Sequence, residues 1–169
     1  PTEFHYEQSK YFLQNQTNVF CEKPGTLSPD SLLELINLSI QNNLYFYIDD
    51  VLIYEDILST KEFIYKKWGG SSLNIIDRMA YHHFYLIADK VDNSEFNITP
   101  IVNNLSYKKF TLDFSGNIFT FEYDFEWYHS KIHNIIPQFN GDALEEMLKQ
   151  VLTKQADFES NHKRSLFAT

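Results

Sequence analysis

The chain has 169 residues, of which 43% are hydrophobic and 22% are charged, a composition typical of a folded globular domain and not of a disordered chain. Its formal net charge of −9 repels phosphate backbones and anionic membranes, which argues against direct binding to nucleic acid or to a membrane surface. Cys21 is the single cysteine, so an intramolecular disulfide and a cysteine metal cluster are excluded.

The first part of the chain contains one well-marked helix. Residues 1–25 lack a clear pattern; we expect an edge strand there, ended by a turn at Pro24-Gly25. Ser28 is a good N-cap and Pro29 suits the first helical position, so a helix is predicted from there until Asn42-Asn43. A buried strand is predicted over residues 44–48.

The middle of the chain is harder to divide into elements. Thr60 is expected to cap a short helix that runs to Trp68 and ends at Gly69-Gly70. Ser72 is expected to open another helix, and residues 84–88 have the composition of a strand.

Residues 107–128 carry the most regular pattern. Apolar side chains alternate with polar ones on both sides of a turn at Ser115-Gly116-Asn117, which is typical of a β-hairpin with one apolar face. The second half of the pattern places an aromatic ring at every other position: Phe119, Phe121, Tyr123, Phe125 and Trp127.

The last predicted element is a helix that begins after Asp142. Asp142 and Glu145 have the spacing of a capping box, and the tail beyond Phe158 is expected to fray. These elements predict an α+β fold: one domain over residues 1–169, with a mainly antiparallel sheet, a long hairpin at about 107–128 and helices packed on one face.

Three carboxylates share the polar face of the predicted hairpin: Glu122, Asp124 and Glu126, followed by Tyr128. Residues two apart on a strand point the same way, about 6 to 7 Å apart, so three negative charges gather on one face. Lys108 and Lys109 on the neighbouring strand offer a structural alternative, in which the chain neutralises its own carboxylates. The other interpretation is a surface that binds a cationic partner.

A second group of acidic and aromatic residues follows the predicted strand 44–48. Tyr45 and Tyr47 lie in that strand, and four carboxylates come after it, at Asp49, Asp50, Glu55 and Asp56. Rings and carboxylates both attract Lys and Arg side chains, so this region is a second candidate for partner binding. The structural alternative is a solvated loop.

The histidines give only incomplete motifs. His129 and His133 have the i, i+4 spacing that places two imidazoles on one helical face, but no glutamate follows His129, so the zinc motif is incomplete. His82 and His83 point in opposite directions if they lie on a strand. We therefore predict no metal site, no catalytic residues and no cofactor; whether His129 and His133 bind a metal stays open.

A small, acidic, aromatic-rich chain with one cysteine and no catalytic signature resembles the immunity proteins of bacterial polymorphic-toxin and contact-dependent growth inhibition systems. The resemblance is one of general character and rests on no shared motif. It implies a cytoplasmic inhibitor, not an enzyme, that neutralises a basic partner protein, such as a toxin nuclease domain. The expected partner is thus a cognate basic protein, with no direct contact to nucleic acid or membrane and an open oligomeric state.

Two alternatives stay open. The first is a small ligand-binding domain or enzyme whose pocket is lined by the aromatic row of residues 119–125. The second is a phage or plasmid protein that inhibits a host nucleic-acid enzyme.

Overall fold

The computed structural model describes residues 1–49, 51–55, 60–66, 80–91, 95–127, 129, 131–135 and 141–169. The helices are α1 (His5–Gln14), α2 (Pro29–Gln41), α3 (Tyr81–Ile87), α4 (Ala143–Leu152) and α5 (Phe158–Ala168). The strands are β1 (Val19–Cys21), β2 (Phe46–Ile48), β3 (Glu62–Lys66), β4 (Asn97–Asn103), β5 (Tyr107–Phe114), β6 (Asn117–Asp124) and β7 (Ile132–His133). Short 3-10 turns cover Thr2–Phe4, Val51–Glu55 and Ala88–Lys90.

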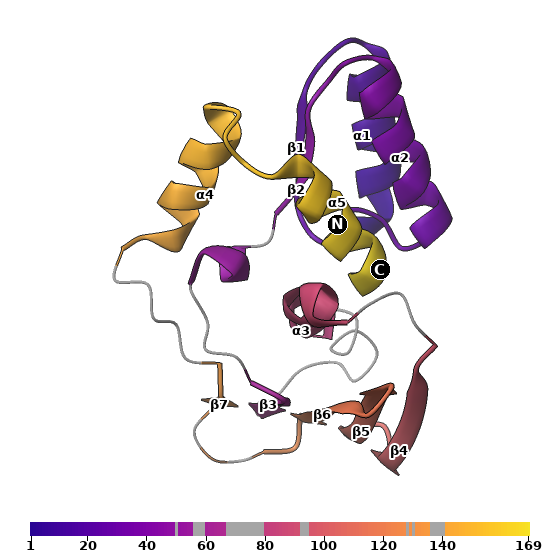
Figure 1. Cartoon of the computed structure of the whole chain (residues 1–169), viewed down its shortest axis with the longest axis vertical. Coiled ribbons are helices and arrows are strands. Elements are labelled where there is room, and N and C mark those ends of the chain that lie inside the picture. The colour runs from indigo at the N-terminus through magenta and orange to yellow at the C-terminus, as the bar shows by residue number, and fades with distance from the viewer. Residues whose placement is uncertain are drawn as a thin grey trace.

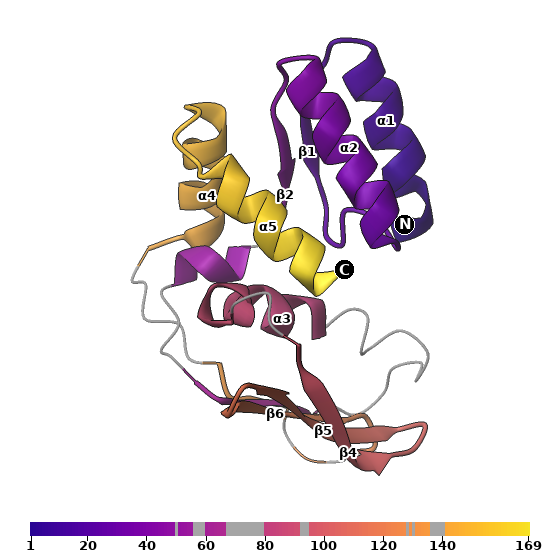
Figure 2. The same cartoon turned by 45° about the vertical axis from the view of Figure 1, so that its right-hand side comes forward.

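The first 48 residues form an α/β unit with the order α1-β1-α2-β2. β1 and β2 pair in parallel, with Phe20 opposite Tyr47, and α2 makes the crossover between them. α1 and α2 lie side by side on one face of this two-stranded sheet (Figures 1 and 2). Leu13, Leu32 and Leu35 are fully buried between these helices and the strands.

Five strands form the second sheet, in the order β4-β5-β6-β3-β7. β5 and β6 pair antiparallel and are joined by Ser115 and Gly116, whose φ angles of 51° and 91° lie in the left-handed region that a tight hairpin turn needs. β3 runs parallel to β6, and β7 pairs antiparallel with the other side of β3. The sheet is therefore mixed.

α3 lies between the five-stranded sheet and the rest of the molecule (Figures 1 and 2). On one side it covers the aromatic face of the sheet, where Phe63, Phe119 and Phe121 are buried. On its other side it packs against α5, which in turn contacts β2. All labelled helices lie on the same side of this sheet in both views.

The predicted fold class is wrong. The chain combines parallel α/β pairing with a mixed sheet, because β1 joins β2 in parallel and β3 joins β6 in parallel. Neither pairing was foreseen, since β1 has only three residues and β3 was predicted as part of a helix. The antiparallel pair at the predicted hairpin ends at Asp124, four residues before the predicted boundary.

Individual element predictions had mixed outcomes. The helix from Pro29 and the strand at 46–48 are confirmed, and so is the helix after Asp142, whose carboxylate accepts hydrogen bonds from the N–H groups of Leu144 and Glu145. Residues 1–25 contain the helix α1, which was not predicted, and the short strand β1 before the Pro24-Gly25 turn. Within the predicted helix at 60–68, Glu62–Lys66 form the strand β3 and residues 67–68 lie outside the described ranges, and the predicted strand at 84–88 belongs to a helical segment. The predicted helix from Ser72 lies outside the described residues.

The tail after Phe158 does not fray; it is the helix α5, whose Asn161 and Ser165 are buried. Across the described segments, no helix has both the length and the apolar character that a membrane crossing requires.

Candidate functional site

A hollow of about 310 Å³ lies where the loop after β1 meets the first turn of α3. Pro24, Thr26 and Leu27 line it from the loop. Ala80, Tyr81 and Phe84 line it from the helix side, and the end of α5 completes it with Ala168 and Thr169. We call this hollow the loop pocket. It lies just beyond the carboxyl end of β1, because β1 ends at Cys21 and runs directly into this loop.

The loop is held by a hydrogen bond from α1 and by hydrogen bonds of its own. His5 at the start of α1 places its Nδ1 2.8 Å from the carbonyl oxygen of Pro24, which accepts the hydrogen bond. Thr26 is 1% exposed; its hydroxyl donates to the carbonyl of Ser28 over 2.6 Å and accepts from the Ser28 N–H over 3.3 Å. The peptide bond between Lys23 and Pro24 is cis.

Gly25 packs the loop directly against β2. A Cβ atom at this position would lie 2.9 Å from Cγ1 of Ile48, which is closer than side-chain carbons approach. The loop can therefore follow this path only because residue 25 has no side chain.

The helical wall of the loop pocket is tied to α5 by two hydrogen bonds. The hydroxyl of Tyr81 donates to Oγ of Ser165 over 3.1 Å, and one turn later Nδ2 of Asn161 donates to the hydroxyl of Tyr85 over 2.8 Å. All four side chains are buried, so these bonds are shielded from water. The wall is thus held in place by polar contacts inside the core.

The loop pocket is uncharged where it is described: none of the side chains that line it there is an acid or a base. Its hydroxyl groups at Thr26 and Tyr81 are already used within the protein. The nearest charged residue along the loop is Lys23, which is half-buried and directly precedes Pro24. The arrangement suits a ligand that presents carbon atoms to the pocket.

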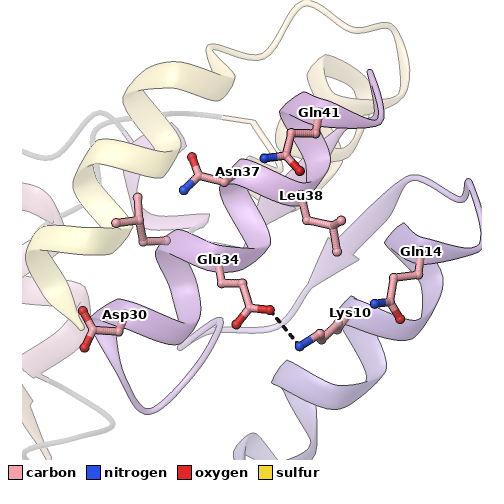
Figure 3. Close-up of a pocket in the computed structure, with 8 residues that line it drawn as sticks. Lys10, Gln14, Asp30, Glu34, Asn37, Leu38 and Gln41 are labelled. Atoms are coloured by element: carbon pink, nitrogen blue, oxygen red, sulfur yellow. Dashed lines mark ion pairs between the residues drawn. The ribbon is translucent and has the colours of Figure 1, made fainter.

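A larger hollow, of about 450 Å³, lies between α1 and α2 (Figure 3). Lys10 points across it and pairs with Glu34 over 2.7 Å. The hydroxyl of Tyr6 donates to Glu34 and accepts from Lys10, so the three side chains form a closed ring of hydrogen bonds. These bonds raise the pKa of Lys10 and lower that of Glu34. The ring joins two helices, and we assign no ligand to this groove.

Of the predicted acidic row, Glu122 is the most affected by its surroundings. It is 8% exposed, and its carboxylate pairs with Lys66 over 2.5 Å and with Lys109 over 3.0 Å. The hydroxyl of Tyr107 donates to it over 3.3 Å. Burial raises the pKa of Glu122, but the hydrogen bonds from the two lysines outweigh burial and hold the pKa below its usual range. Glu122 is therefore not an exposed anion.

The other two carboxylates of the row differ from Glu122 in their surroundings. Asp124 is half-buried and accepts a hydrogen bond from the Glu126 N–H over 3.0 Å, whereas Glu126 is exposed. Tyr128 lies outside the described residues.

The second acidic group is only partly described. Asp49 directly follows β2 and is half-buried, and its N–H donates to the Cys21 carbonyl over 2.7 Å. Glu55 ends a 3-10 turn, and both Asp50 and Asp56 lie outside the described residues. A cation does lie over the ring of Tyr45, but it is the chain's own Lys154 at 4.7 Å.

The histidines pair differently from the predicted spacing. His129 is exposed and contacts Trp127, while His133 lies in β7 with its Nε2 3.3 Å from Nε2 of His83. His82 and His83 are in the helix α3, not on a strand. Within the ranges that the structure describes, no three His, Cys, Asp or Glu side chains come together as a metal site.

The loop after β1 was missed as a functional segment because the strand expected within residues 1–25 was not paired with the strand predicted at 44–48. One signal was present: the apolar triplet Val19-Phe20-Cys21, then a Pro-Gly turn, then the α2 helix and the 46–48 strand. A strand, a helix and a second strand in this order indicate a parallel pair, whose connecting loop begins at the carboxyl edge.

Comparisons with known proteins find the same fold in several solved structures and a family model that matches the first part of the chain. Residues 1–49 match the model of a family described as "Oxidoreductase family, NAD-binding Rossmann fold". The solved WlbA dehydrogenase of Thermus thermophilus, in complex with NAD and UDP-GlcNAcA, is 14% identical with a TM-score of 0.73, over 99% of this chain and 68% of that one. No curated protein sequence matches the chain.

Two further solved structures share the fold. UDP-N-acetylglucosamine 3-dehydrogenase GnnA of Acidithiobacillus ferrooxidans is 11% identical, with a TM-score of 0.75 over 99% of this chain and 72% of that one. An NAD-binding protein of Listeria innocua is 12% identical, with a TM-score of 0.68 over 99% and 71% of the two chains.

These findings correct the interpretation made from the sequence. The resemblance to immunity proteins is wrong, because the matched family model and the structural neighbours are oxidoreductases and dehydrogenases. The expectations of a non-enzymatic inhibitor and of a basic toxin domain as partner are contradicted for the same reason. The alternative of an enzyme or ligand-binding domain fits better. Its aromatic row is not a pocket lining, however: Phe119, Phe121 and Tyr123 are at most 1% exposed, inside the core.

Proposed function

We propose that this chain forms the substrate-binding part of a nicotinamide-dependent oxidoreductase that acts on a sugar or sugar nucleotide. The observation that carries the proposal is the position of the loop pocket, beyond the carboxyl end of a parallel strand. Ligands of open α/β sheets bind outside the carboxyl ends of the strands. The NAD-binding family model over residues 1–49 supports the cofactor, and the sugar-nucleotide dehydrogenases among the structural neighbours support the substrate class.

The sequence lacks the glycine turn that commonly holds the pyrophosphate group of a dinucleotide. Such groups are commonly held by a G-x-G-x-x-G turn, but the five glycines stand at positions 25, 69, 70, 116 and 141, and no two are separated by a single residue. We therefore assign no residue of this chain to the pyrophosphate. When bound, a nicotinamide cofactor supplies hydride transfer.

The chain's own contribution is to hold the substrate. Leu27, 68% exposed at the rim, and Phe84 offer apolar contact to the carbon face of a sugar ring.

Chemical-shift mapping by NMR tests the site. UDP-N-acetylglucosamine and NAD are titrated separately into the labelled protein, and we expect the backbone amides of residues 25–27 and 80–84 to shift with the sugar nucleotide. Shifts confined to the groove between α1 and α2, or no shift at millimolar ligand, would overturn the proposal.

A further inference from the structure

The carbonyl of Pro24, on one wall of the loop pocket, is bound by a side chain from α1. His5, the first residue of that helix, places its Nδ1 2.8 Å from this carbonyl oxygen. Because a carbonyl oxygen can only accept, the hydrogen of the bond lies on Nδ1 of His5. Both residues are half-buried, so the bond is partly shielded from water. His5 does not itself line the pocket, so its effect on a ligand passes through Pro24.

The peptide unit between Pro24 and Gly25 has few other restraints. Proline has no N–H, so the carbonyl is the one backbone group of Pro24 that can form a hydrogen bond. Gly25 has no Cβ atom and can adopt either sign of φ, which lets the preceding carbonyl rotate to either side. The thiol of Cys21, a weak donor, lies 3.3 Å from the Glu22 carbonyl and 3.9 Å from the Gly25 carbonyl. The bond from His5 is therefore the strong contact that orients this peptide.

The pocket wall that the loop forms is fixed at two points, one beside each helix of the α/β unit. Downstream, the Thr26 hydroxyl is bonded to Ser28, which directly precedes α2. Upstream, His5 holds Pro24 to α1. Pro24 and Thr26 both line the loop pocket, so the two anchors together set the shape of this wall. A ligand binds more tightly to a wall that is already ordered, because less conformational freedom is lost on binding.

We propose that His5 is a positioning residue for the loop pocket: by donating to the Pro24 carbonyl, it holds the loop in the form that binds a sugar nucleotide. This role rests on the proposed function, which supplies the ligand. Without the bond, the peptide between Pro24 and Gly25 takes up other orientations, and only a fraction of the molecules has the wall in place. The apparent affinity falls by that fraction. Loss of one partly shielded hydrogen bond corresponds to about a fivefold change.

Three variants of the full chain test this role, with UDP-N-acetylglucosamine as the probe. His5→Ala removes the donor, whereas the side-chain amide of His5→Asn keeps an N–H group at the position of Nδ1. Tyr6→Phe is the matched control, because it removes the neighbouring bonds of α1 to Glu34 and Lys10 and leaves the loop untouched. We expect the dissociation constant to rise about fivefold in His5→Ala, to return to within about twofold of the parent in His5→Asn and to stay unchanged in Tyr6→Phe. His5→Gln, whose amide lies one bond farther from the backbone, replaces His5→Ala if that variant does not fold.

NMR spectra of the ligand-free proteins report on the loop independently of binding. The backbone amides of residues 25–27 should shift in His5→Ala, return to the parent positions in His5→Asn and stay in place in Tyr6→Phe. Unchanged amides in His5→Ala would show that the bond does not hold the loop, which overturns the proposal. Shifted amides with an unchanged dissociation constant overturn it as well, because His5 would then be a structural contact only.

Urea unfolding separates positioning of the loop from stability of α1. His5→Ala and Tyr6→Phe each lose a hydrogen-bonding group of α1, so both should unfold at lower urea concentration, whereas only His5→Ala should lose affinity. Equal losses of affinity in the two variants would refute the role of His5, because binding would then follow the stability of the helix. A parent protein that does not bind UDP-N-acetylglucosamine would instead remove the proposed function, and with it the ligand that this role requires.

Discussion

Asn161 of α5 binds both backbone groups of Ile48, the last residue of β2. Its Oδ1 accepts from the Ile48 N–H over 3.0 Å, and its Nδ2 donates to the Ile48 carbonyl over 2.8 Å and to the hydroxyl of Tyr85. One side-chain amide thereby joins the parallel sheet to α3. Beside it, Nε2 of His162 lies 2.6 Å from the Phe46 carbonyl, so α5 occupies the place where a next strand would pair.

Removal of this amide should be costly. In Asn161→Ala the N–H and carbonyl of Ile48 lose their buried partner, so we expect the free energy of unfolding to fall by about 2–4 kcal/mol. Urea denaturation measures the change. Asn37→Ala, which removes an exposed amide from the groove between α1 and α2, should change it by less than about 0.5 kcal/mol. Equal losses in both variants would contradict the bridging role.

The two predicted helix caps should differ in how much they stabilise the folded protein. Asp142 accepts from the N–H groups of Leu144 and Glu145 over 3.0 and 3.1 Å, whereas the Ser28 side chain makes no cap hydrogen bond to α2. Asp142→Ala should therefore lower stability by about 1 kcal/mol, and Ser28→Ala by only a few tenths. Thermal unfolding of both variants, run side by side, tests this ranking; the reverse order would count against the cap geometry.

Glu122 should stabilise the sheet at neutral pH. Its pKa is held low by Lys66 and Lys109, so the ionised form contributes stability above the usual Glu range, and this contribution is lost as the pH falls through the lowered pKa. Glu122→Gln leaves two lysines facing each other and should cost about 1–2 kcal/mol at pH 7, since the site is partly solvated. The cost should shrink at pH 3.

Asp124→Asn is the matched control for Glu122→Gln. Its side-chain oxygen can still accept the Glu126 N–H, so the change at pH 7 should stay within about 0.5 kcal/mol. Denaturant unfolding at both pH values compares the two variants. A pH-independent cost in Glu122→Gln would show that packing, and not charge, is responsible.

Gly25→Ala should disturb the loop pocket through a steric contact. The new methyl group would meet Cγ1 of Ile48 at 2.9 Å, so we expect a loss of about 1–3 kcal/mol and shifted amides at residues 24–27 in NMR spectra. Ile48→Ala removes the Cγ1 atom that the new methyl group would meet. The double variant should therefore cost less than the sum of the two single changes. Strict additivity would argue that the contact does not limit the loop.

The elements that sequence patterns predicted well are those with a regular apolar face and a clear boundary. α2 begins at Pro29 and buries Leu32, Leu35 and Ile36 on one stripe, and α4 has an acidic cap that the structure uses. On β6, the rings at 119, 121 and 123 all face the core, as strict alternation predicts.

α3 and α5 were missed because their burial does not follow a simple stripe. α3 is covered by the sheet on one side and by α5 on the other, so Tyr81, His83, Tyr85 and Ile87 are all buried and imitate the alternation of a strand. The two fully buried side chains of α5, Asn161 and Ser165, are polar, and its apolar residues Phe158, Leu166 and Phe167 are only partly buried, so its hydrophobic signal is weak. Burial of hydrogen-bonded polar groups is visible only once the partners are placed.

The candidate site could be predicted from the sequence even less well than the helices α3 and α5. Residues of the loop pocket come from three segments, around 24–27, 80–84 and 168–169, and they meet only through long-range packing. Likewise His83 and His133 are 50 positions apart, so no local spacing connects them. The acidic row was visible, but the ion pair between Glu122 and Lys66 depends on the parallel β3–β6 pairing.

In each of the two sheets, a side-chain amide binds backbone groups at an edge where another strand would otherwise pair. On the outer edge of β2, Asn161 binds the N–H and the carbonyl of Ile48. On β3, past the end of β7, Oδ1 of Asn134 accepts from the Ile64 N–H and its Nδ2 donates to the Glu62 carbonyl. A side-chain amide binds these backbone groups without presenting a new strand edge, so no further strand can pair at that position. Within the described part of the chain, α5 thus covers the outer side of β2 at Phe46 and Ile48, so an added strand would pair beside β1 instead.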